Sequence, residues 1–222
     1  MLVYVMCGVA CVVAYLLCGI PSAYLVGERI AHVDVRKVGS GNVGSTNVVR
    51  AAGAKAGAIT LLLDICKAAA SIGIGYLLVG CIGTGAGISQ VVPGAVFDWT
   101  MALVYLSCVL GHVFTPYLHF KGGKGIAVGF GGALALMPPV AASLLVPFLV
   151  FAVTTRYVSL GSIAAAVSLP FLTVLISRPS AAFTAIVAIV ALLVVWAHRK
   201  NIAKLAKGTE SKFSFKRSKG GE

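Results

Sequence analysis

Residues 181–201 read AAFTAIVAIVALLVVWA followed by HRKN, and this stretch decides the fold class. The segment up to Ala197 carries no charge, and a helix needs about 20 mostly apolar residues to cross a bilayer. The whole chain is 59% hydrophobic and 11% charged, with a mean hydropathy of +1.00. Soluble domains carry about 25% charged residues. The chain is therefore an integral membrane protein.

Other apolar segments predict the rest of the bundle, at about 2–27, 56–82, 99–119 and 158–177. Residues 126–154 are also apolar, but Pro138-Pro139 interrupts them, because proline removes a backbone donor and clashes with the preceding turn. We expect two short helices there, 126–137 and 140–154, each too short to span comfortably. The prediction is an all-α polytopic membrane protein with seven transmembrane helices, two of them short; a count of five is the alternative.

Basic residues mark one end of these helices. If the uncharged N-terminus lies outside, the inner segments 28–55, 120–125, 154–157 and 198–222 hold every Lys and Arg except Lys67 and Arg178. Cytoplasmic loops of membrane proteins carry such an excess. We therefore expect a cytoplasmic C-terminus and a cytoplasmic polar face. Topology accounts for most of the formal charge of +12, and no tract interleaves basic and aromatic residues, so nucleic acid is not expected as a partner.

One membrane domain is expected over residues 1–210, with a basic and disordered tail over 211–222. The N-terminus lacks a positive first region and a small-residue cleavage pattern, so it is interpreted as a retained helix and not as a signal peptide. The six cysteines lie in or beside apolar segments. We interpret them as small buried residues, in preference to metal ligands or disulfides.

The first polar stretch is Gly39–Arg50, GSGNVGSTNVVR. Its glycines let a backbone approach an anion closely, and Arg50 supplies a planar fork suited to phosphate oxygens. A helix that starts near Ser45 would add its first amides. An ordinary glycine-rich turn that caps a helix is the alternative. The neutral hydrogen-bonding side chains are Ser40, Asn42, Ser45, Thr46 and Asn47.

The second polar stretch is Lys121–Gly125, KGGKG. Two lysines among three glycines are typical of a phosphate-binding nest of amides, although lysines at this position also serve topology alone. The stretch is not a Walker A loop, because Leu118 stands at the first glycine position and Gly125 follows Lys124. Nucleotide hydrolysis is therefore disfavoured.

The third polar stretch is HRKN, in which His198 and Asn201 are three apart and share a helix face. Histidine can act as an acid or a base, or donate a hydrogen bond to a phosphate. It can also simply cap the helix. Ser159 and Ser162 also share a face, near the inner surface, and indicate little on their own.

Asp64 and Lys67 lie three apart within an apolar segment. Charges at this depth are costly, and they pair or face the bundle interior. We favour a mutually neutralised structural pair, with a contribution to a substrate cavity as the alternative.

In their order along residues 1–210, these pieces resemble the bacterial acyl-phosphate-dependent glycerol-3-phosphate acyltransferases, the PlsY family. Each motif is weak alone, and the ordered combination on one face is specific. The matching motifs are Ile20–Tyr24, Gly39–Arg50, Asp64 with Lys67, Gly111-His112, Phe120–Gly125, Thr155–Ser162, and His198–Ile202 with Gly208 and Glu210.

The resemblance implies a multi-pass protein of the bacterial cytoplasmic (inner) membrane with seven helices and a cytoplasmic active site. The implied reaction transfers a fatty acyl group from acyl phosphate to the sn-1 hydroxyl of glycerol 3-phosphate, giving lysophosphatidate and inorganic phosphate, the first step of phospholipid synthesis. Expected partners are the two substrates and membrane lipids; a monomer without cofactor or metal is expected. A phosphate-binding transporter or lipid flippase is the alternative function.

The resemblance also implies roles for individual residues. We assign Arg50, Lys124, His198 and Asn201 to the glycerol phosphate. Ser40 and Asn42, with the nearby amides, are assigned to the acyl phosphate or its oxyanion. Either His198 or a substrate phosphate oxygen takes the proton, and an acyl-Ser40 intermediate lacks a neighbouring base in sequence. The predicted catalytic residues are Ser40, Arg50, Lys124, His198 and Asn201. The predicted substrate-binding residues are Gly41, Asn42, Thr46, Asn47, Gly122, Gly123, Gly125, Ser159 and Ser162.

Overall fold

The computed structural model describes residues 1–85 and 96–213, and these residues form helices and loops without a strand. Residues 86–95, between the predicted helices 56–82 and 99–119, and most of the predicted basic tail lie outside the described residues. In chain order the helices are α1 (Leu2–Gly19), α2 (Ser22–Ala31), α3 (Ser45–Gly75), η1 (Tyr76–Thr84), α4 (Val96–Val113), η2 (Pro116–Leu118), α5 (Ile126–Leu136), α6 (Pro138–Thr155), α7 (Val158–Ser177), α8 (Ala181–Ala197) and α9 (Arg199–Ala206).

Five helical stretches of the described chain are long and apolar enough to cross a membrane. A sixth arises if α8 and α9 count as one span bent by 55°, and α5 is a shorter apolar helix. The five stretches are Leu2–Ala31, Ser45–Gly83, Val96–Leu118, Pro138–Thr155 and Val158–Ser177. The all-helical membrane fold is therefore confirmed.

Prolines set two of the helix boundaries: the break at Pro138 was predicted, and the predicted helix 2–27 is divided at Pro21. At Pro21 the chain breaks between α1 and α2, and the carbonyls exposed by the break accept hydrogen bonds from Thr115 Oγ1 (to Gly19, 2.5 Å) and Lys67 Nζ (to Ile20, 2.7 Å). At Pro138 the chain begins α6, because a proline in the first turn gives up no helical hydrogen bond.

The predicted shortness of the segment after Pro138 was wrong. The two prolines belong to the first turn of α6 instead of the loop before it, so this helix has 18 residues and is long enough to span. The helix before the break, α5, has 11 residues and ends at Leu136, as expected.

Glycine divides α3 in a way that the sequence did not indicate. Gly53 adopts φ +87°, a conformation outside the helical region, so the turns from Ser45 to Ala52 form a separate piece from the rest of α3. A residue with a side chain rarely adopts this conformation. Because of this break, the amides at the start of α3 belong to a short helical piece that is distinct from the long apolar part.

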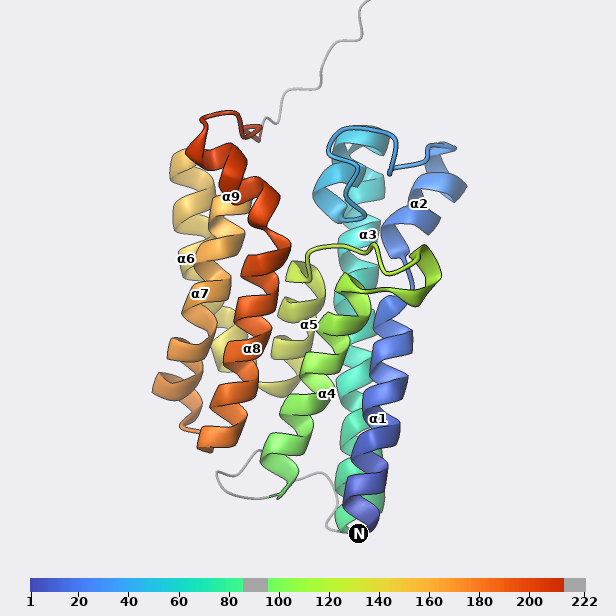
Figure 1. Ribbon diagram of the computed structural model, residues 1–222, viewed down its shortest axis with the longest axis vertical. Coiled ribbons are helices and arrows are strands. Elements are labelled where there is room, and N and C mark those ends of the chain that lie inside the picture. The colour runs from blue at the N-terminus through green and yellow to red at the C-terminus, as the bar shows by residue number, and fades with distance from the viewer. Residues whose placement is uncertain (86–95, 214–222) are drawn as a thin grey trace, which may run out of the picture.

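Two groups of helices stand side by side, with α5 between them (Figure 1). In one group α1 packs along α4 and α3; in the other α6 packs on α7 and α7 on α8. The central α5 contacts α3, α4 and α6. Its glycines allow this, because a Cβ at Gly131 would lie 2.5 Å from the carbonyl oxygen of Ile65 on α3. Close approach through small residues is how helices associate within lipid.

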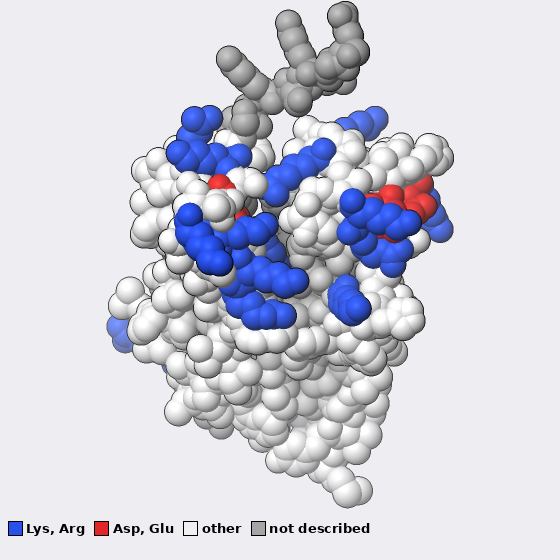
Figure 2. Space-filling view, turned by 45° about the horizontal axis from the view of Figure 1, so that its top comes forward, with Lys and Arg blue, Asp and Glu red and all other residues white. Residues whose placement is uncertain are grey.

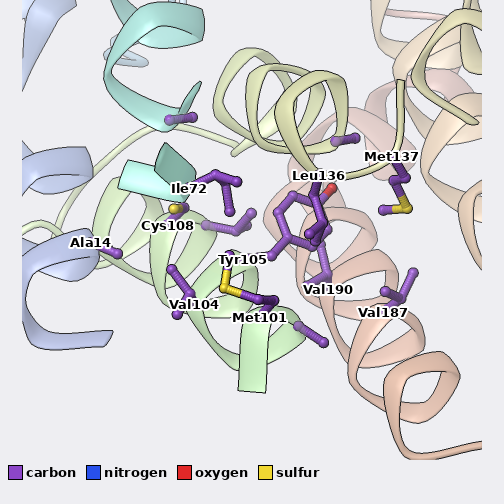
Figure 3. Packing of buried hydrophobic residues seen from close by; sticks show 14 of the residues in the cluster. Ala14, Ile72, Met101, Val104, Tyr105, Cys108, Leu136, Met137, Val187 and Val190 are labelled. Carbon is purple, nitrogen blue, oxygen red and sulfur yellow. The ribbon is translucent and has the colours of Figure 1, made fainter. Parts of the chain in front are cut away.

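The largest buried cluster joins the two groups (Figure 3). Tyr105 of α4 lies among Ile72 of α3, Leu136 of α5 and Val190 of α8. Its hydroxyl donates to the carbonyl of Gly129 at 2.9 Å, so its single polar group is satisfied. The core therefore fixes α5, and with it the loop that leads into α5.

Charge divides the molecule into two ends. Most Lys and Arg side chains gather at the end that carries α2 and α9, and the opposite part of the visible surface is largely free of them (Figure 2). All three polar stretches of the sequence lie toward the basic end.

Candidate active site

A cavity of about 600 Å³ lies toward the basic end, and all three polar stretches contribute to its lining. It brings together eleven of the fourteen predicted site residues, from five segments of the chain. Those eleven are Ser40, Asn42, Thr46, Asn47, Arg50, Lys124, Gly125, Ser159, Ser162, His198 and Asn201. The other three, Gly41, Gly122 and Gly123, are not among the residues that line the cavity.

The loop before α3 is held by the side chain of Asn47. Asn47 Oδ1 accepts from the amide of Ser40 at 2.9 Å and from its hydroxyl at 3.2 Å. Asn47 Nδ2 donates to the carbonyls of Val35, at 2.8 Å, and Val38, at 3.1 Å. Both donors and the acceptor oxygen are thus engaged, so the structure gives Asn47 the task of positioning Ser40.

The start of α3 faces the cavity with unused hydrogen-bonding capacity. Helix α3 begins at Ser45, as predicted, and both Ser45 and Thr46 line the cavity. The first amides of a helix lack intrahelical partners and attract anions. Within the described chain, Asn42 and Thr46 have no side-chain hydrogen bond, so they are also free for a ligand.

Two cations from different segments of the chain line the cavity. The guanidinium of Arg50, on α3, makes no hydrogen bond or ion pair with any described residue and is exposed to solvent. Lys124 lies in the loop before α5, where burial lowers its pKa to about 8, an effect that nearby Glu210 partly opposes and Arg50 reinforces. A partly desolvated ammonium next to an unpaired guanidinium is a strong site for a phosphate.

The loop between η2 and α5 is held by its own backbone. The amide of Gly122 donates to the Val113 carbonyl and that of Gly123 to the His112 carbonyl, each at 3.0 Å. A Cβ at Gly122 would collide with the carbonyl oxygen of His112. These two amides are therefore occupied by α4, and the phosphate nest predicted from KGGKG is reduced to Lys124 and Gly125.

His198 lies at the junction of α8 and α9, buried against the cavity wall. Its Nδ1 is 2.8 Å from the carbonyl oxygen of Val194. Because a carbonyl only accepts, Nδ1 carries a proton. Burial lowers the pKa of His198 to about 4, so the ring is neutral at pH 7 and Nε2 is an acceptor.

A carboxylate joins two of the predicted site residues. Glu210 Oε1 accepts from Ser159 Oγ and from Asn201 Nδ2, each at 2.8 Å. Glu210 itself lines the cavity, and the amide of Phe213 donates to the Arg156 carbonyl at 2.8 Å. Residues just past 210, the predicted start of a disordered tail, therefore form part of the cavity wall.

Ser162 is differently engaged, because its hydroxyl donates to the Val158 carbonyl at 2.9 Å. Its lone pairs stay available, so it can accept a hydrogen bond from a ligand more readily than it can donate one.

A buried ion pair lies at the wall of the cavity. Lys67 Nζ is 2.8 Å from Asp64 Oδ1, which confirms the predicted pair. Asp64 also lines the cavity together with His112 of α4. His112 and Glu210 belong to the matching motifs but had no predicted role. A lone histidine near the end of an apolar helix was the available signal for His112, because ionisable residues in membrane helices are usually functional.

A second cavity of about 230 Å³ adjoins the first and is almost entirely apolar. Its walls come from α3 to α8 and include Tyr105 and Leu169. Five residues line both cavities: Leu61, Gly125, Ile126, Ala127 and Phe148. The combined site therefore has a cationic compartment for a phosphate and an apolar compartment for a hydrocarbon chain.

The protein therefore belongs to a class of membrane proteins that bind a phosphate and a lipid chain in adjoining cavities. The model of the glycerol-3-phosphate acyltransferase family matches residues 8–208. The chain belongs to this family, and it is an acyltransferase, as the motifs predicted.

Individual relatives agree with this assignment. The glycerol-3-phosphate acyltransferase of Rubrobacter xylanophilus is 39% identical over 207 residues, which is 93% of this chain and 95% of that protein. That of Syntrophomonas wolfei is 38% identical over 205 residues, 92% of this chain and 96% of that protein.

Two crystal structures of PlsY, described as an integral membrane glycerol 3-phosphate acyltransferase, have the same fold. The glycerol 3-phosphate form is 31% identical, with a TM-score of 0.80 over 94% of this chain and 96% of that one. The lysophosphatidic acid form is 30% identical, with a TM-score of 0.78 over 94% and 95%.

Proposed function

We propose that the chain transfers a fatty acyl group from acyl phosphate to the sn-1 hydroxyl of glycerol 3-phosphate, releasing lysophosphatidate and inorganic phosphate. This would be the first step of phospholipid synthesis. The observation that carries the proposal is the junction of the two cavities, since the reaction needs two phosphates beside one long acyl chain. The relatives' names and the two ligand forms of PlsY point to the same acceptor and product.

Acyl phosphate is a mixed anhydride, so its phosphate leaves without strong acid catalysis. The protein's main task is to neutralise the phosphates and to place the hydroxyl against the carbonyl carbon. Such placement is worth about 7–11 kcal/mol in ideal cases. Arg50 and Lys124 would hold the glycerol phosphate together with Asn201, and the start of α3 with Asn42 would face the acyl phosphate.

The proton of the attacking hydroxyl is best received by His198. Its Nδ1 is committed to the Val194 carbonyl, so the neutral ring offers only a lone pair at Nε2. The hydroxyl oxygen bonds to the carbonyl carbon, the bond from that carbon to the phosphate oxygen breaks, and the proton passes through Nε2 to a phosphate oxygen or water. Transfer of the proton directly to a substrate phosphate oxygen is the alternative route.

Direct transfer is favoured over an acyl-Ser40 intermediate. The Ser40 hydroxyl has one side-chain partner among the described residues, the carbonyl oxygen of Asn47, and an amide cannot take its proton. A serine without a base is a weak nucleophile.

We further propose seven membrane helices, made of the five long stretches, α5 and α8. The N-terminus would lie outside and the C-terminus and the polar cavity in the cytoplasm, in the bacterial cytoplasmic (inner) membrane. The concentration of Lys and Arg at one end supports this orientation. We propose a monomer, because one chain brings eleven of the fourteen predicted site residues to one cavity and the site needs no residue from a second copy.

The test is release of inorganic phosphate from palmitoyl phosphate by purified protein. We expect release that requires glycerol 3-phosphate and is matched by formation of lysophosphatidate. Arg50→Ala and Lys124→Ala should each lower kcat/KM by about 10³-fold, about 4 kcal/mol, with an unchanged melting temperature. Counterflow of glycerol 3-phosphate across liposome membranes, without phosphate release, would show that the protein is a transporter and not an enzyme.

A further inference from the structure

The buried side chain of His112 lies at the cavity and has no assigned part in the proposed reaction. His112, near the end of α4, is 8% exposed and lines the polar cavity. Its two ring nitrogens face different surroundings, and these surroundings determine where its proton lies.

The Nδ1 atom faces a cation. Lys67 Nζ lies 3.5 Å from His112 Nδ1, 2.7 Å from the Ile20 carbonyl oxygen and 3.4 Å from the Ser22 hydroxyl. An ammonium only donates, so a proton on Nδ1 would point at the ammonium protons. Asp64 Oδ1, at 3.9 Å, lies beyond hydrogen-bond distance from Nδ1. The neutral ring therefore keeps its lone pair on Nδ1 and its proton on Nε2.

The Nε2 atom faces the loop before α5. A Cβ at Gly123 would collide with Nε2, so only glycine lets the loop pack this closely against the edge of the ring. Within the described residues Nε2 has no hydrogen-bond partner, although it is not among the fully buried atoms without one. The imidazole thus presents an unused N–H donor at the cavity wall.

The segments packed around His112 lead to the boundary between the two cavities. Gly123 is two residues from Gly125, which lines both cavities, and Asp64 is one helical turn from Leu61, which also lines both. An acyl phosphate with its chain in the apolar cavity and its phosphate in the polar one places its carbonyl group at this boundary.

We propose that His112 donates a hydrogen bond from Nε2 to the carbonyl oxygen of the acyl phosphate and stabilises the oxyanion that forms there. The inference rests on the proposed acyl-phosphate reaction. His198 approaches from α8, and its Nδ1 partner Val194 lines the apolar cavity. The two histidines thus carry opposite tautomers: His198 accepts the proton of the nucleophile, and His112 donates to the electrophile.

Two substitutions separate this role from a structural one. His112→Asn keeps an acceptor for Lys67 near the Nδ1 position but lacks the reach of Nε2. His112→Gln places its amide N–H near the Nε2 position and gives up the acceptor at Nδ1. We expect the Asn variant to lose 10²–10³-fold in kcat, as for removal of one oxyanion donor, and the Gln variant to retain at least tenfold more activity. A purely structural histidine gives the reverse order, which overturns the proposal.

The matched control is His119→Asn, which changes an exposed histidine outside the cavity lining, at a left-handed position that asparagine tolerates. Its kcat should equal that of the original chain. Melting temperatures of all variants in detergent, together with the KM for glycerol 3-phosphate, should stay within error of the original values.

Binding of unreactive analogues gives a second measurement, which needs no turnover. A long-chain β-ketophosphonate has the carbonyl oxygen, and the corresponding alkylphosphonate lacks it. The original chain should bind the ketone at least tenfold more tightly, and His112→Asn should lose this preference while binding the alkylphosphonate unchanged. If the Asn variant does not fold, a Gln variant that loses the preference overturns the proposal and one that keeps it supports it.

Failure of this inference is distinct from failure of the proposed reaction. If the original chain releases phosphate and His112→Asn retains full kcat and ketone preference, only the role of His112 is wrong. If the original chain releases no phosphate with either substrate present, the acyl-phosphate reaction is wrong.

Discussion

The two glycine-rich loops at the cavity have similar composition and are held in place in opposite ways. The loop before α3, residues 35–44, is held mainly by one side chain, because Asn47 makes four hydrogen bonds to residues 35–40. Two short backbone turns add to it, in which the amides of Lys37 and Gly41 donate to the carbonyls of Asp34 and Val38. The loop before α5, residues 119–125, is fixed by its own amides, which donate to carbonyls of the α4 end and of Thr115.

This difference teaches which groups are left for a ligand. In the first loop the four hydrogen bonds of Asn47, here called the clamp, hold the backbone in place. The side chains of Asn42 and Thr46 and the first amides of α3 therefore remain available to a ligand. In the second loop the amides of residues 120–123 are occupied, so Lys124 and Gly125 are the groups left for a ligand. A glycine-rich sequence beside a phosphate site therefore does not by itself make an amide nest.

Of the two loops, the second should be the more sensitive to a change in how its backbone is held. Gly122→Ala places a methyl group against the His112 carbonyl, so the loop and Lys124 must shift. We expect a loss of about 1–3 kcal/mol in stability and about 10²-fold in kcat/KM, since small misplacements cost that much. Thermal melting and phosphate release measure the two effects.

The matched control is Gly73→Ala, where a Cβ would meet nothing within 4 Å. It should be as stable as the original chain or slightly more so, because alanine favours the helix over glycine. Equal behaviour of the two variants would contradict the proposed packing role of Gly122.

A smaller effect should follow from removing the clamp of the first loop. Asn47→Asp keeps an acceptor for the Ser40 amide but turns an oxygen toward the carbonyls of Val35 and Val38. We expect a loss of about 1–3 kcal/mol in stability, as for unsatisfied buried groups, and about tenfold in kcat/KM. Hydrogen exchange over residues 35–44 should rise in parallel.

Val38→Ala is the control for this loop, since it trims an exposed side chain and keeps the carbonyl that Asn47 binds. Unchanged hydrogen exchange in Asn47→Asp would show that the loop does not depend on the clamp.

The smallest effect should come from pH. Because burial lowers the pKa of Lys124 to about 8, its charge is present below that pH and lost above it. Substrate phosphates with a second pKa near 6 are already dianionic there. We expect kcat/KM for glycerol 3-phosphate to fall up to tenfold per unit above about pH 8. Lys124→Arg should remove this fall, because arginine stays protonated; a flat profile to pH 9.5 in the original chain would argue against a Lys124–phosphate contact.

Local physics allowed much of the fold to be predicted. Pro138 marks a break because proline lacks an amide donor wherever it stands. The apolar segments 158–177 and 181–197 match α7 and α8 residue for residue. The start of α3 at Ser45 followed from the glycine and serine residues before it. These features depend on neighbours in the sequence.

Features that depend on contacts between distant parts of the chain could not be predicted from the sequence. The occupied amide of Gly122 depends on where α4 ends, and the place of Glu210 at the cavity depends on how the chain returns after α9. The tautomer of His112 depends on Lys67, 45 residues earlier. Arg50, Lys124 and His198 were predicted because each stood in a polar stretch beside an apolar segment.

The five residues shared by the two cavities also bear on the direction of the reaction. When the acyl group has moved, the new lipid keeps its chain in the apolar compartment, whereas inorganic phosphate occupies the polar compartment alone. The two products therefore leave toward different phases, one into the bilayer and one into water. Dilution of phosphate in the aqueous phase makes it rare for both products to return to the site together, while the equilibrium itself is set by the reactive mixed anhydride.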